Sequence, residues 1–179
     1  AAVTALRAAG SQKGYCLVLG AGTGRLAYEI ARRSQLRVIG VEPDAAKVDA
    51  TRRLLSRTGL YGTRIVVHHA QFDELPYQKR SANLIVSEQA LRTGTLPPSA
   101  AEVYRLLRPC GGTAVFIQSP GHGSPKKLAD WAKKDLPGAR VTTTEAGDHL
   151  LTLRRGPLEG AGEWTHFYAD AGNSACSYD

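Results

Sequence analysis

The sequence has no methionine and only three cysteines. Because the 179 residues include no start residue, we expect the chain to be a processed product or a piece of a longer gene product. The cysteines lie at positions 16, 110 and 176 without C-x-x-C spacing, which argues against a disulfide framework and against a zinc site. This cysteine usage favours a reducing compartment, so we expect a cytoplasmic location.

Long apolar runs are also missing. No segment approaches the roughly 20 apolar residues that a membrane-spanning helix needs. The first ten residues carry one charge and no long apolar stretch, unlike a secretory signal. We therefore expect no membrane partner. What is present, 42% hydrophobic and 22% charged residues, is the ordinary composition of one globular domain.

The net charge of +7 is concentrated in one part of the chain. Residues 25–64 contain nine Lys or Arg but only four acidic residues. Such an excess can contact nucleic acid. However, these basic residues fall on the polar sides of expected helices, and only two aromatic residues, Tyr28 and Tyr61, are interleaved with them. Solvated helix faces are therefore the favoured interpretation, and nucleic acid is the less favoured partner.

Short apolar runs alternate with helical patterns along the chain. This alternation predicts an α/β fold with a doubly wound, mostly parallel sheet and helices on both faces. The composition changes after Arg155, so we predict one domain over 1–155 and a linker, or the start of a following domain, over 156–179. We expect strands at 15–19, 37–41, 65–68, 83–87, 113–118, 141–144 and 149–154, and helices at 3–9, 25–33, 45–55, 100–107 and 126–134.

A glycine-rich turn, Gly20-Ala-Gly-Thr-Gly24, follows the first expected strand. Glycines there permit a tight turn and leave the backbone open to a ligand. A dinucleotide-binding turn places its third glycine one residue later, where this chain has Arg25. The spacing therefore disfavours NAD and FAD. Because ligands of such sheets bind beyond the carboxyl ends of the strands, the segments that follow each strand are the candidate site.

Two other post-strand segments carry suitable side chains. Glu42 closes the second strand, where a carboxylate can accept hydrogen bonds from ribose hydroxyls, and Pro43 turns the chain away. Gln71 and Phe72 follow the third strand. The side-chain carbonyl of Gln71 can accept from an adenine amino group, and the ring of Phe72 can cover one adenine face. A polar loop residue beside a core aromatic is an equally favoured interpretation of this pair.

Taken together in order, five segments resemble the class I S-adenosylmethionine-dependent methyltransferases. The resemblance covers about residues 1–155. It implies a Rossmann-like, seven-stranded sheet with an antiparallel last strand, S-adenosylmethionine as cofactor, and methyl transfer to a small-molecule acceptor. The matching segments are 17–24, 38–44, 71–76, 82–87 and 102–112. The implied cofactor-binding residues are Gly20, Ala21, Gly22 and Gly24 in the turn, Glu42 and Pro43 at the ribose, Gln71 and Phe72 at the adenine, and Ser87.

Three positions depart from the family pattern. The adenine position is usually acidic but is Gln71 here, the fourth strand commonly has Asp where Asn83 stands, and Cys110 interrupts the usual Pro-Gly-Gly turn. The departures leave open a non-catalytic cofactor-binding or scaffold module, and the basic helices leave open an RNA methyltransferase.

No catalytic residue is assigned from the sequence, and no metal site is expected. A general base would help methyl transfer to an amine or hydroxyl. Glu88 after the fourth strand and His122 after the fifth are candidates, although solvated loop residues are the favoured interpretation of both. His68 and His69 alternate faces at a strand end, so structural roles are favoured over a shared metal. Cys110, at the edge of the sheet opposite the expected site, is interpreted as structural.

The end of the chain has a separate resemblance. Residues 163–177, with Trp164, His166 and Tyr168 among them, are similar to the opening of quinoprotein-like (PQQ-type) β-propeller proteins. The resemblance implies a covalently attached downstream domain.

Overall fold

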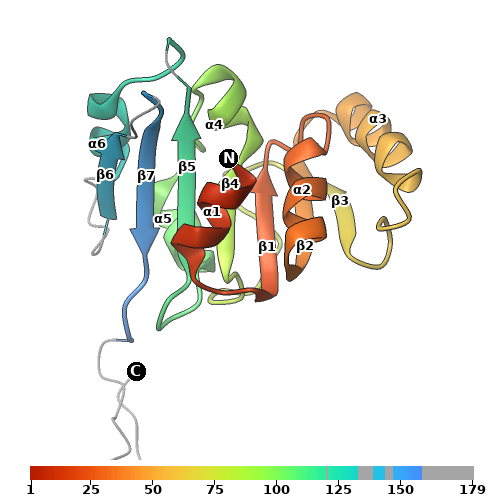
Figure 1. Ribbon diagram of the computed structural model, residues 1–179, viewed down its shortest axis with the longest axis horizontal. Coiled ribbons are helices and arrows are strands. Elements are labelled where there is room, and N and C mark those ends of the chain that lie inside the picture. Colours follow the sequence, from red (N-terminus) through yellow and green to blue (C-terminus); the bar gives the residue numbers. More distant parts are fainter. Residues whose placement is uncertain (120, 133–138, 144–146, 159–179) are drawn as a thin grey trace, which may run out of the picture.

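The computed structural model describes residues 1–119, 121–132, 139–143 and 147–158. Figure 1 shows the elements along the chain, with helices and strands largely alternating. The helices are α1 (Ala2–Ala9), α2 (Arg25–Arg33), α3 (Ala45–Ser56), α4 (Glu88–Thr93), α5 (Ala100–Leu106) and α6 (Pro125–Ala132). The strands are β1 (Lys13–Leu19), β2 (Gln35–Glu42), β3 (Ile65–His69), β4 (Leu84–Ser87), β5 (Thr113–Gln118), β6 (Ala139–Thr143) and β7 (His149–Arg154).

The strands form one seven-stranded sheet in the order β3-β2-β1-β4-β5-β7-β6. Strands β1 to β5 pair in parallel, and β7 runs antiparallel to both β5 and β6. The prediction of a mostly parallel sheet with an antiparallel last strand is therefore confirmed. The strand order reverses direction between β1 and β4, which makes the carboxyl ends of these two strands the switch point of the sheet.

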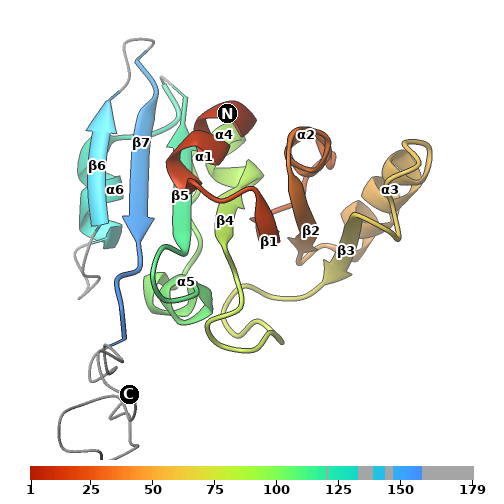
Figure 2. The ribbon, with the colours of Figure 1, turned by 60° about the horizontal axis from the view of Figure 1, so that its bottom comes forward.

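Helices cover both faces of the sheet, as the apolar strand sequences require. Successive residues of β1 point to opposite faces. Cys16 and Val18 pack with α1, α2 and α3, while Leu17 and Leu19 pack in a second cluster with α5 and α6. Figure 2 shows α1, α2 and α3 on one side of the sheet and α5 on the other. With one apolar layer on each face, the sheet is a rigid support for the loops at its carboxyl edge.

Two helices begin at residues whose side chains cap them, Asp44 and Ser99. Asp44 caps α3, because its carboxylate accepts from the backbone N–H groups of Ala46 and Lys47. Ser99 caps α5 by accepting from the N–H of Glu102. The sequence Ser99-x-x-Glu102 is that of a capping box, but the carboxylate of Glu102 does not accept from the N–H of Ser99. It accepts instead from Leu75 N at 2.9 Å and pairs with Arg105, whose guanidinium lowers the pKa of Glu102.

Helix α4 was not predicted from the sequence, which indicated a strand over 83–87 and favoured a loop position for Glu88. The structure corrects this. Ser87 is the N-cap of α4 and accepts from Ala90 N at 3.0 Å, Glu88 lies in the first turn, Arg92 in the last, and Gly94 ends the helix in a left-handed conformation. These are ordinary helix start and stop signals. They were missed because six residues are too short to show an apolar periodicity.

The last described element, β7, ends at Arg154, within the predicted domain over 1–155. The Arg155 side chain is held by the domain, since its guanidinium donates to the carbonyls of Tyr104 and Leu107. The domain boundary itself stays a prediction. Residues 159–179, including the propeller-like segment, lie outside the described residues. Over the described ranges, no helix combines the length and apolar character needed to cross a bilayer.

Candidate functional site

The glycine turn lies between the ends of β1 and β2. The N–H groups of Gly20 and Ala21 both donate to the carbonyl of Val41, at 2.9 and 3.1 Å, which fixes the turn against β2. Gly22 has a φ of 53°, in the left-handed region that favours glycine. A Cβ on Gly22 would lie 3.0 Å from Glu88 Oε1 and 3.3 Å from Arg92 Nη1. The backbone at Gly22 is therefore approached closely by α4, and a side chain there would crowd Glu88 and Arg92.

Glu42 faces this turn from the last position of β2. Its side chain is buried, with 5% of the residue exposed, and its Oε2 accepts from Gly22 N at 3.3 Å. Parallel pairing of β1 with β2 places Leu19 opposite Val41, so the next residues of both strands meet at the same edge. The sheet therefore presents a backbone N–H and a carboxylate side by side at its switch point.

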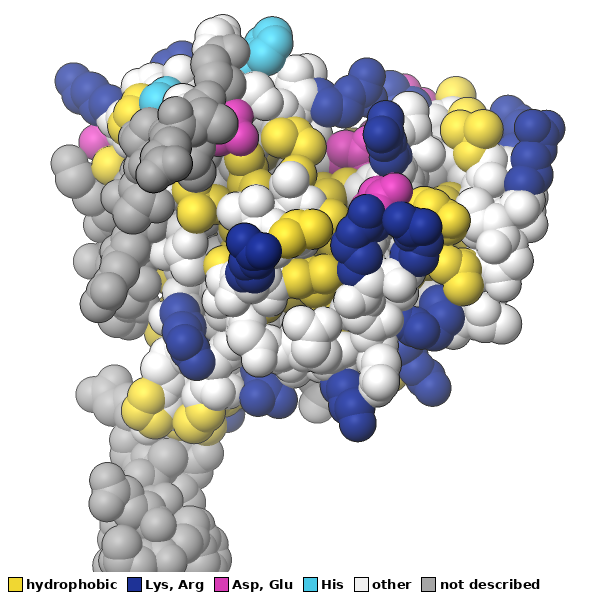
Figure 3. Space-filling model, viewed as in Figure 1, with side chains coloured by type: hydrophobic (Ala, Val, Ile, Leu, Met, Phe, Trp, Pro, Cys, Tyr) yellow, Lys and Arg dark blue, Asp and Glu magenta, His cyan; other side chains and the backbone are white. Residues whose placement is uncertain are grey.

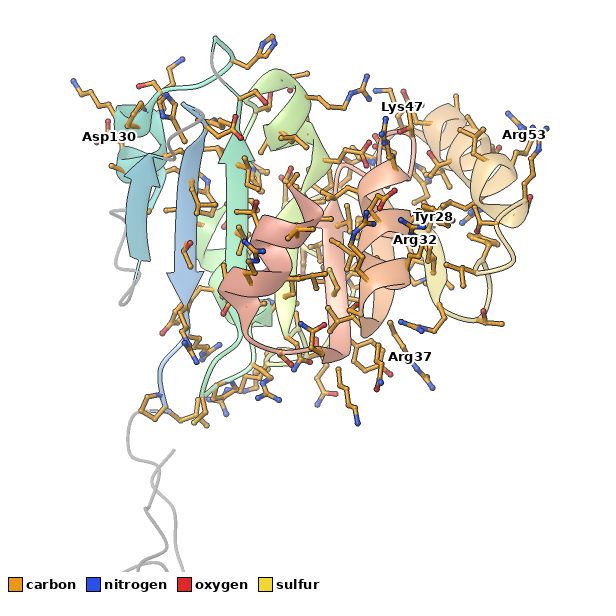
Figure 4. All side chains as sticks on the ribbon, in the orientation of Figure 1. Tyr28, Arg32, Arg37, Lys47, Arg53 and Asp130 are labelled. Atoms are coloured by element: carbon orange, nitrogen blue, oxygen red, sulfur yellow. The ribbon has the colours of Figure 1, made fainter. Side chains whose placement is uncertain are left out.

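A cavity of about 530 Å³ opens beside the turn and Glu42. This is within the range of about 300–1,000 Å³ typical of small-molecule sites. Its walls come from the glycine turn, the end of β2, the start of α3, the segment after β3, helix α4 and the segment after it. Figure 4 shows Lys47 at this edge of the sheet. The lining residues are Gly20, Gly22, Glu42, Pro43, Asp44, Lys47, Phe72, Glu88, Gln89, Arg92, Thr93, Thr95, Leu96 and Pro98.

Five of the nine cofactor-binding residues predicted from the sequence line this cavity: Gly20, Gly22, Glu42, Pro43 and Phe72. The structure gives the other four different surroundings, and their role in binding stays a prediction. Ala21 is buried, and Ser87 caps α4. Gly24 packs against α3, where a Cβ would lie 3.0 Å from Leu55 and Thr51. Gln71 is exposed and is not among the lining residues in the described part of the chain.

Glu88 is the main site residue that sequence reasoning underestimated. A solvated loop residue was the favoured interpretation, but Glu88 is only 4% exposed and belongs to α4. Its Oε1 accepts from Thr23 Oγ1 and its Oε2 from Leu26 N, both at 3.2 Å. The carboxylate thereby binds the start of α2 and closes one wall of the cavity. Burial raises the pKa of Glu88, although these hydrogen bonds and nearby Arg92 oppose the increase.

We expect the stability of the Glu88→Gln variant, relative to the unchanged protein, to rise with pH. Because the pKa of Glu88 is higher in the folded state than its ordinary value of 4.5, the folded protein binds the proton more tightly. The stability contributed by this proton is present below the unfolded pKa and is lost as the pH rises through the folded pKa. Glutamine does not titrate, so the variant lacks this loss. Urea unfolding of both proteins between about pH 4 and about pH 7 measures the difference.

Asp73→Asn is the matched control for the Glu88 experiment, because Asp73 is an exposed carboxylate of the same chain. A stability difference between Glu88→Gln and the unchanged protein that stays constant with pH, or falls, would contradict the prediction.

The histidines named from the sequence do not reach the cavity. His122 is exposed and lies after β5. His68 Nδ1 lies 2.9 Å from the hydroxyl of Tyr77. Burial raises the pKa of Tyr77 to about 12. His69 Nε2 lies 2.9 Å from the carbonyl of Pro43 and so supports the turn after β2. In the described ranges, no three or more His, Cys, Asp or Glu side chains are grouped so that they could hold a metal ion.

Several basic residues of the 25–64 segment are used inside the fold. Arg64 donates to the carbonyls of Ser34 and Leu36, at 2.8 and 2.9 Å, and Arg52 donates to the carbonyl of Val67 at 2.8 Å. Arg33 pairs with Glu29. Figure 3 shows Lys and Arg side chains spread over the visible face, with apolar, acidic and other surface among them. The number of cations free to contact phosphates is therefore smaller than the composition suggests.

Comparison with known proteins gives matches at the level of sequence family and of fold. The family described as methyltransferase domain matches residues 16–111. Dimethylglycine N-methyltransferase of Parasynechococcus marenigrum (strain WH8102) is 41% identical over 106 residues, which are 58% of this chain and 37% of that enzyme. The chain thus spans little more than a third of that relative's length.

Two solved structures show the same fold at low sequence identity. An S-adenosylmethionine-dependent methyltransferase from Aquifex aeolicus superposes with a TM-score of 0.66, 15% identity and coverage of 86% of this chain and 87% of the other. The [4+2]-cyclase SpnF superposes with a TM-score of 0.71, 16% identity and coverage of 88% and 81%. Since a cyclase shares the Rossmann-like fold, the fold alone does not identify the reaction.

Proposed function

Because the chain belongs to the methyltransferase domain family, as its match over residues 16–111 shows, we propose that it binds S-adenosylmethionine in the cavity beside Glu42. We propose further that it takes part in methyl transfer to a small-molecule acceptor. One observation carries the proposal: the N–H of Gly22 and the carboxylate of Glu42 lie 3.3 Å apart in the wall of a cavity at the switch point of the sheet.

The cavity offers recognition groups that fit an adenosyl ligand. No hydrogen bond among the described residues engages Glu42 Oε1, so this oxygen is available to accept from a ribose hydroxyl. Phe72 and Pro43 supply apolar surface for a purine ring. The turn at Gly20 and Gly22 leaves backbone exposed where the ligand continues past the ribose. We therefore place the adenosine between Glu42 and Phe72, with the rest of the cofactor over the turn.

When bound, S-adenosylmethionine supplies an electrophilic methyl group on a sulfonium. The residues of this chain orient the reactants and exclude water from them, and alignment of this kind is worth effective molarities of up to about 10⁵–10⁸ M. Of the two bases considered from the sequence, only Glu88 lines the cavity. Its carboxylate is next to Gly22, where it can stabilise a nearby positive charge.

The three positions that depart from the family pattern lie away from the cavity. This supports an active enzyme over a non-catalytic cofactor-binding module. Asn83 Oδ1 accepts from Tyr15 N at 3.1 Å, so it holds β4 to β1. Cys110 has a φ of 55° and its N–H donates to the carbonyl of Gly156, near the start of β5. Gln71 is exposed. None of these three lines the cavity in the described part of the chain.

Isothermal titration calorimetry with S-adenosylmethionine and S-adenosylhomocysteine tests the proposal, with NAD as the control nucleotide. We expect both sulfur nucleosides to bind and NAD to give no heat of binding. Methyl transfer from radiolabelled S-adenosylmethionine to a panel of amines, carboxylates and RNA then identifies the acceptor class. Failure of both sulfur nucleosides to bind would refute the proposed function, and binding without transfer to any acceptor would favour the scaffold module.

Two further proposals concern the setting of the domain. We propose a cytoplasmic location, which the cysteine usage supports. We also propose a downstream domain attached through residues 156–179, which the change in composition and the propeller-like segment support. RNA is the less favoured acceptor, because Arg52 and Arg64 are engaged with backbone carbonyls of the fold.

A further inference from the structure

The connection from β3 to β4 carries one wall of the cavity beside Glu42. It spans residues 70–83, and within this described range it forms neither a helix nor a strand. Phe72 lines the cavity and packs against the apolar cluster that contains the buried Leu75. Ordering such a connection costs conformational entropy, so contacts from another element must offset that cost if Phe72 is to stay at the cavity.

Helix α5 supplies these contacts through Glu102 and Arg105. Glu102 Oε1 accepts from Leu75 N at 2.9 Å, three residues after Phe72. The two terminal nitrogens of Arg105 donate to the carbonyls of Tyr77 and Leu75, at 3.0 and 3.1 Å. The backbone of Leu75 is thus bound on both sides, at its N–H by a carboxylate and at its carbonyl by a guanidinium. Figure 2 shows the connection passing beside α5 on its way to β4.

The two charged side chains also hold each other. Arg105 Nε lies 2.7 Å from Glu102 Oε2, and Arg105 Nη2 lies 2.7 Å from Glu102 Oε1. This is the two-pronged arrangement in which an arginine and a carboxylate bind most strongly. The side chain of Glu102 is only 10% exposed, so the pair is partly shielded from water. Loss of either charge therefore loosens the grip of α5 on Leu75.

The orientation of Glu102 serves the connection and not the start of its own helix. Ser99 already caps α5, and the carboxylate of Glu102 points to Leu75 N, which is 27 residues away along the chain. Glu102 is not among the lining residues of the cavity in the described part of the chain. Its effect on a ligand must therefore pass through the connection.

We propose that Glu102 is a positioning residue that, with Arg105, holds Phe72 at the cavity wall and thereby sets the affinity for the adenine nucleoside. The inference rests on the proposed function, which places the adenosine between Glu42 and Phe72. The apparent Kd equals the intrinsic Kd divided by the fraction of molecules whose site is in place. A loosened connection therefore raises the Kd although no group that touches the ligand is altered.

Calorimetry with S-adenosylhomocysteine on single and double variants tests the proposal. Phe72→Ala should raise the Kd about tenfold, as for the loss of one base-stacking contact. Glu102→Gln and Arg105→Lys should each raise it about fivefold, if Phe72 is then at the cavity for about a fifth of the time. Because both act through Phe72, neither should weaken binding further in the Phe72→Ala background.

Val103→Ala is the matched control, because Val103 is a buried apolar residue of the same helix. It should lower the free energy of unfolding, which urea measures, and leave the Kd unchanged. A rise in Kd equal to that of Glu102→Gln would overturn the proposal, since general loosening of α5 would then be sufficient. Unchanged Kd values in Glu102→Gln and Arg105→Lys, or effects that add to that of Phe72→Ala, would also overturn it.

Fluorine NMR of the ligand-free protein separates this proposal from the proposed function. The chain has three phenylalanines, at positions 72, 116 and 167, so 4-fluorophenylalanine gives three resonances, and Phe72→Ala identifies the first. Glu102→Gln should shift or broaden the Phe72 resonance and leave that of the buried Phe116 unchanged. An unaltered Phe72 resonance would refute the positioning role. If S-adenosylhomocysteine does not bind the unchanged protein, the proposed function fails and this spectrum alone decides whether Glu102 positions Phe72.

Discussion

Replacing Gly22 with valine should abolish cofactor binding while the protein stays folded. A Cβ at this position would lie 3.0 Å from Glu88 Oε1, and the branched side chain would extend into the cavity over the turn. We expect the Kd for S-adenosylhomocysteine to rise about 100-fold or more, equivalent to roughly 2.8 kcal/mol. Calorimetry measures the affinity, and circular dichroism with urea unfolding measures how much fold stability is retained.

The Gly59→Val variant separates loss of space from backbone strain. Gly59 has a φ of 72°, comparable to that of Gly22, but nothing lies within 4 Å of a Cβ placed there. Both variants should lose about 1–2 kcal/mol of stability through the left-handed backbone. Only Gly22→Val should lose affinity. Equal affinities of the two variants would show that the glycine turn lies outside the binding site.

Replacing Glu42 with alanine should weaken the binding of S-adenosylhomocysteine by about 1.5–3 kcal/mol, which is roughly 10- to 150-fold in Kd. The variant loses a buried carboxylate that faces the cavity, and with it the acceptor of the hydrogen bond from Gly22 N. The expected loss therefore combines the missing contact to the ribose with a less firmly held turn. Methylthioadenosine, which retains the ribose, should weaken to the same extent.

Asp73→Ala is the control for the Glu42 experiment, since Asp73 is an exposed acid that follows Phe72 directly and is not among the cavity residues. Its affinity should equal that of the unchanged protein. An unaltered Kd in Glu42→Ala would show that Glu42 supports the turn but does not contact the nucleoside.

The strands could be predicted because a strand that is buried on both faces consists mostly of consecutive apolar residues. The run at 15–19 is continuously apolar and the run at 113–118 is apolar at its four central positions, as is typical of strands covered on both faces, and the strand at 113–118 has the predicted bounds. Helix α4 was not predicted, because its stability depends on contacts that are distant in sequence. Its N-cap Ser87 belongs to a sheet strand, and its Glu88 binds residues 62 and 65 positions earlier.

The candidate site was predictable where it depends on the ends of parallel strands. Turns after neighbouring parallel strands must meet at one edge, so strand geometry alone predicts that Gly22 and Glu42 face each other. Gln71 was placed in the site because it follows the third strand and carries a side-chain carbonyl, but the chain turns there so that its side chain is exposed. The path of a loop after a strand depends on the residues that it packs against, and a local sequence pattern does not predict these contacts.

The roles of the individual arginines could not be predicted from their charge or from their place in the sequence. Arg64 and Arg25 belong to the same basic segment of the sequence. Arg64 donates to the carbonyls of Ser34 and Leu36, whereas Arg25 lines a cavity between the starts of α1 and α2. The sequence predicts that both arginines lie on the polar sides of their elements. The packing of helices and strands places Arg64 near backbone carbonyls and Arg25 near a cavity.

The amino-acid sequence by itself determined the sheet and the helices that pack on its two faces. It also determined that the glycine turn at Gly22 faces the carboxylate of Glu42. These follow from short-range periodicity and from the geometry of parallel strands. Only the tertiary structure decided that Glu88 is buried against the start of α2, that Arg92 lines the cavity beside Glu42, and that Gln71 is exposed. The physical reason is that burial and side-chain pairing are set by residues far away along the chain, after the layers have packed.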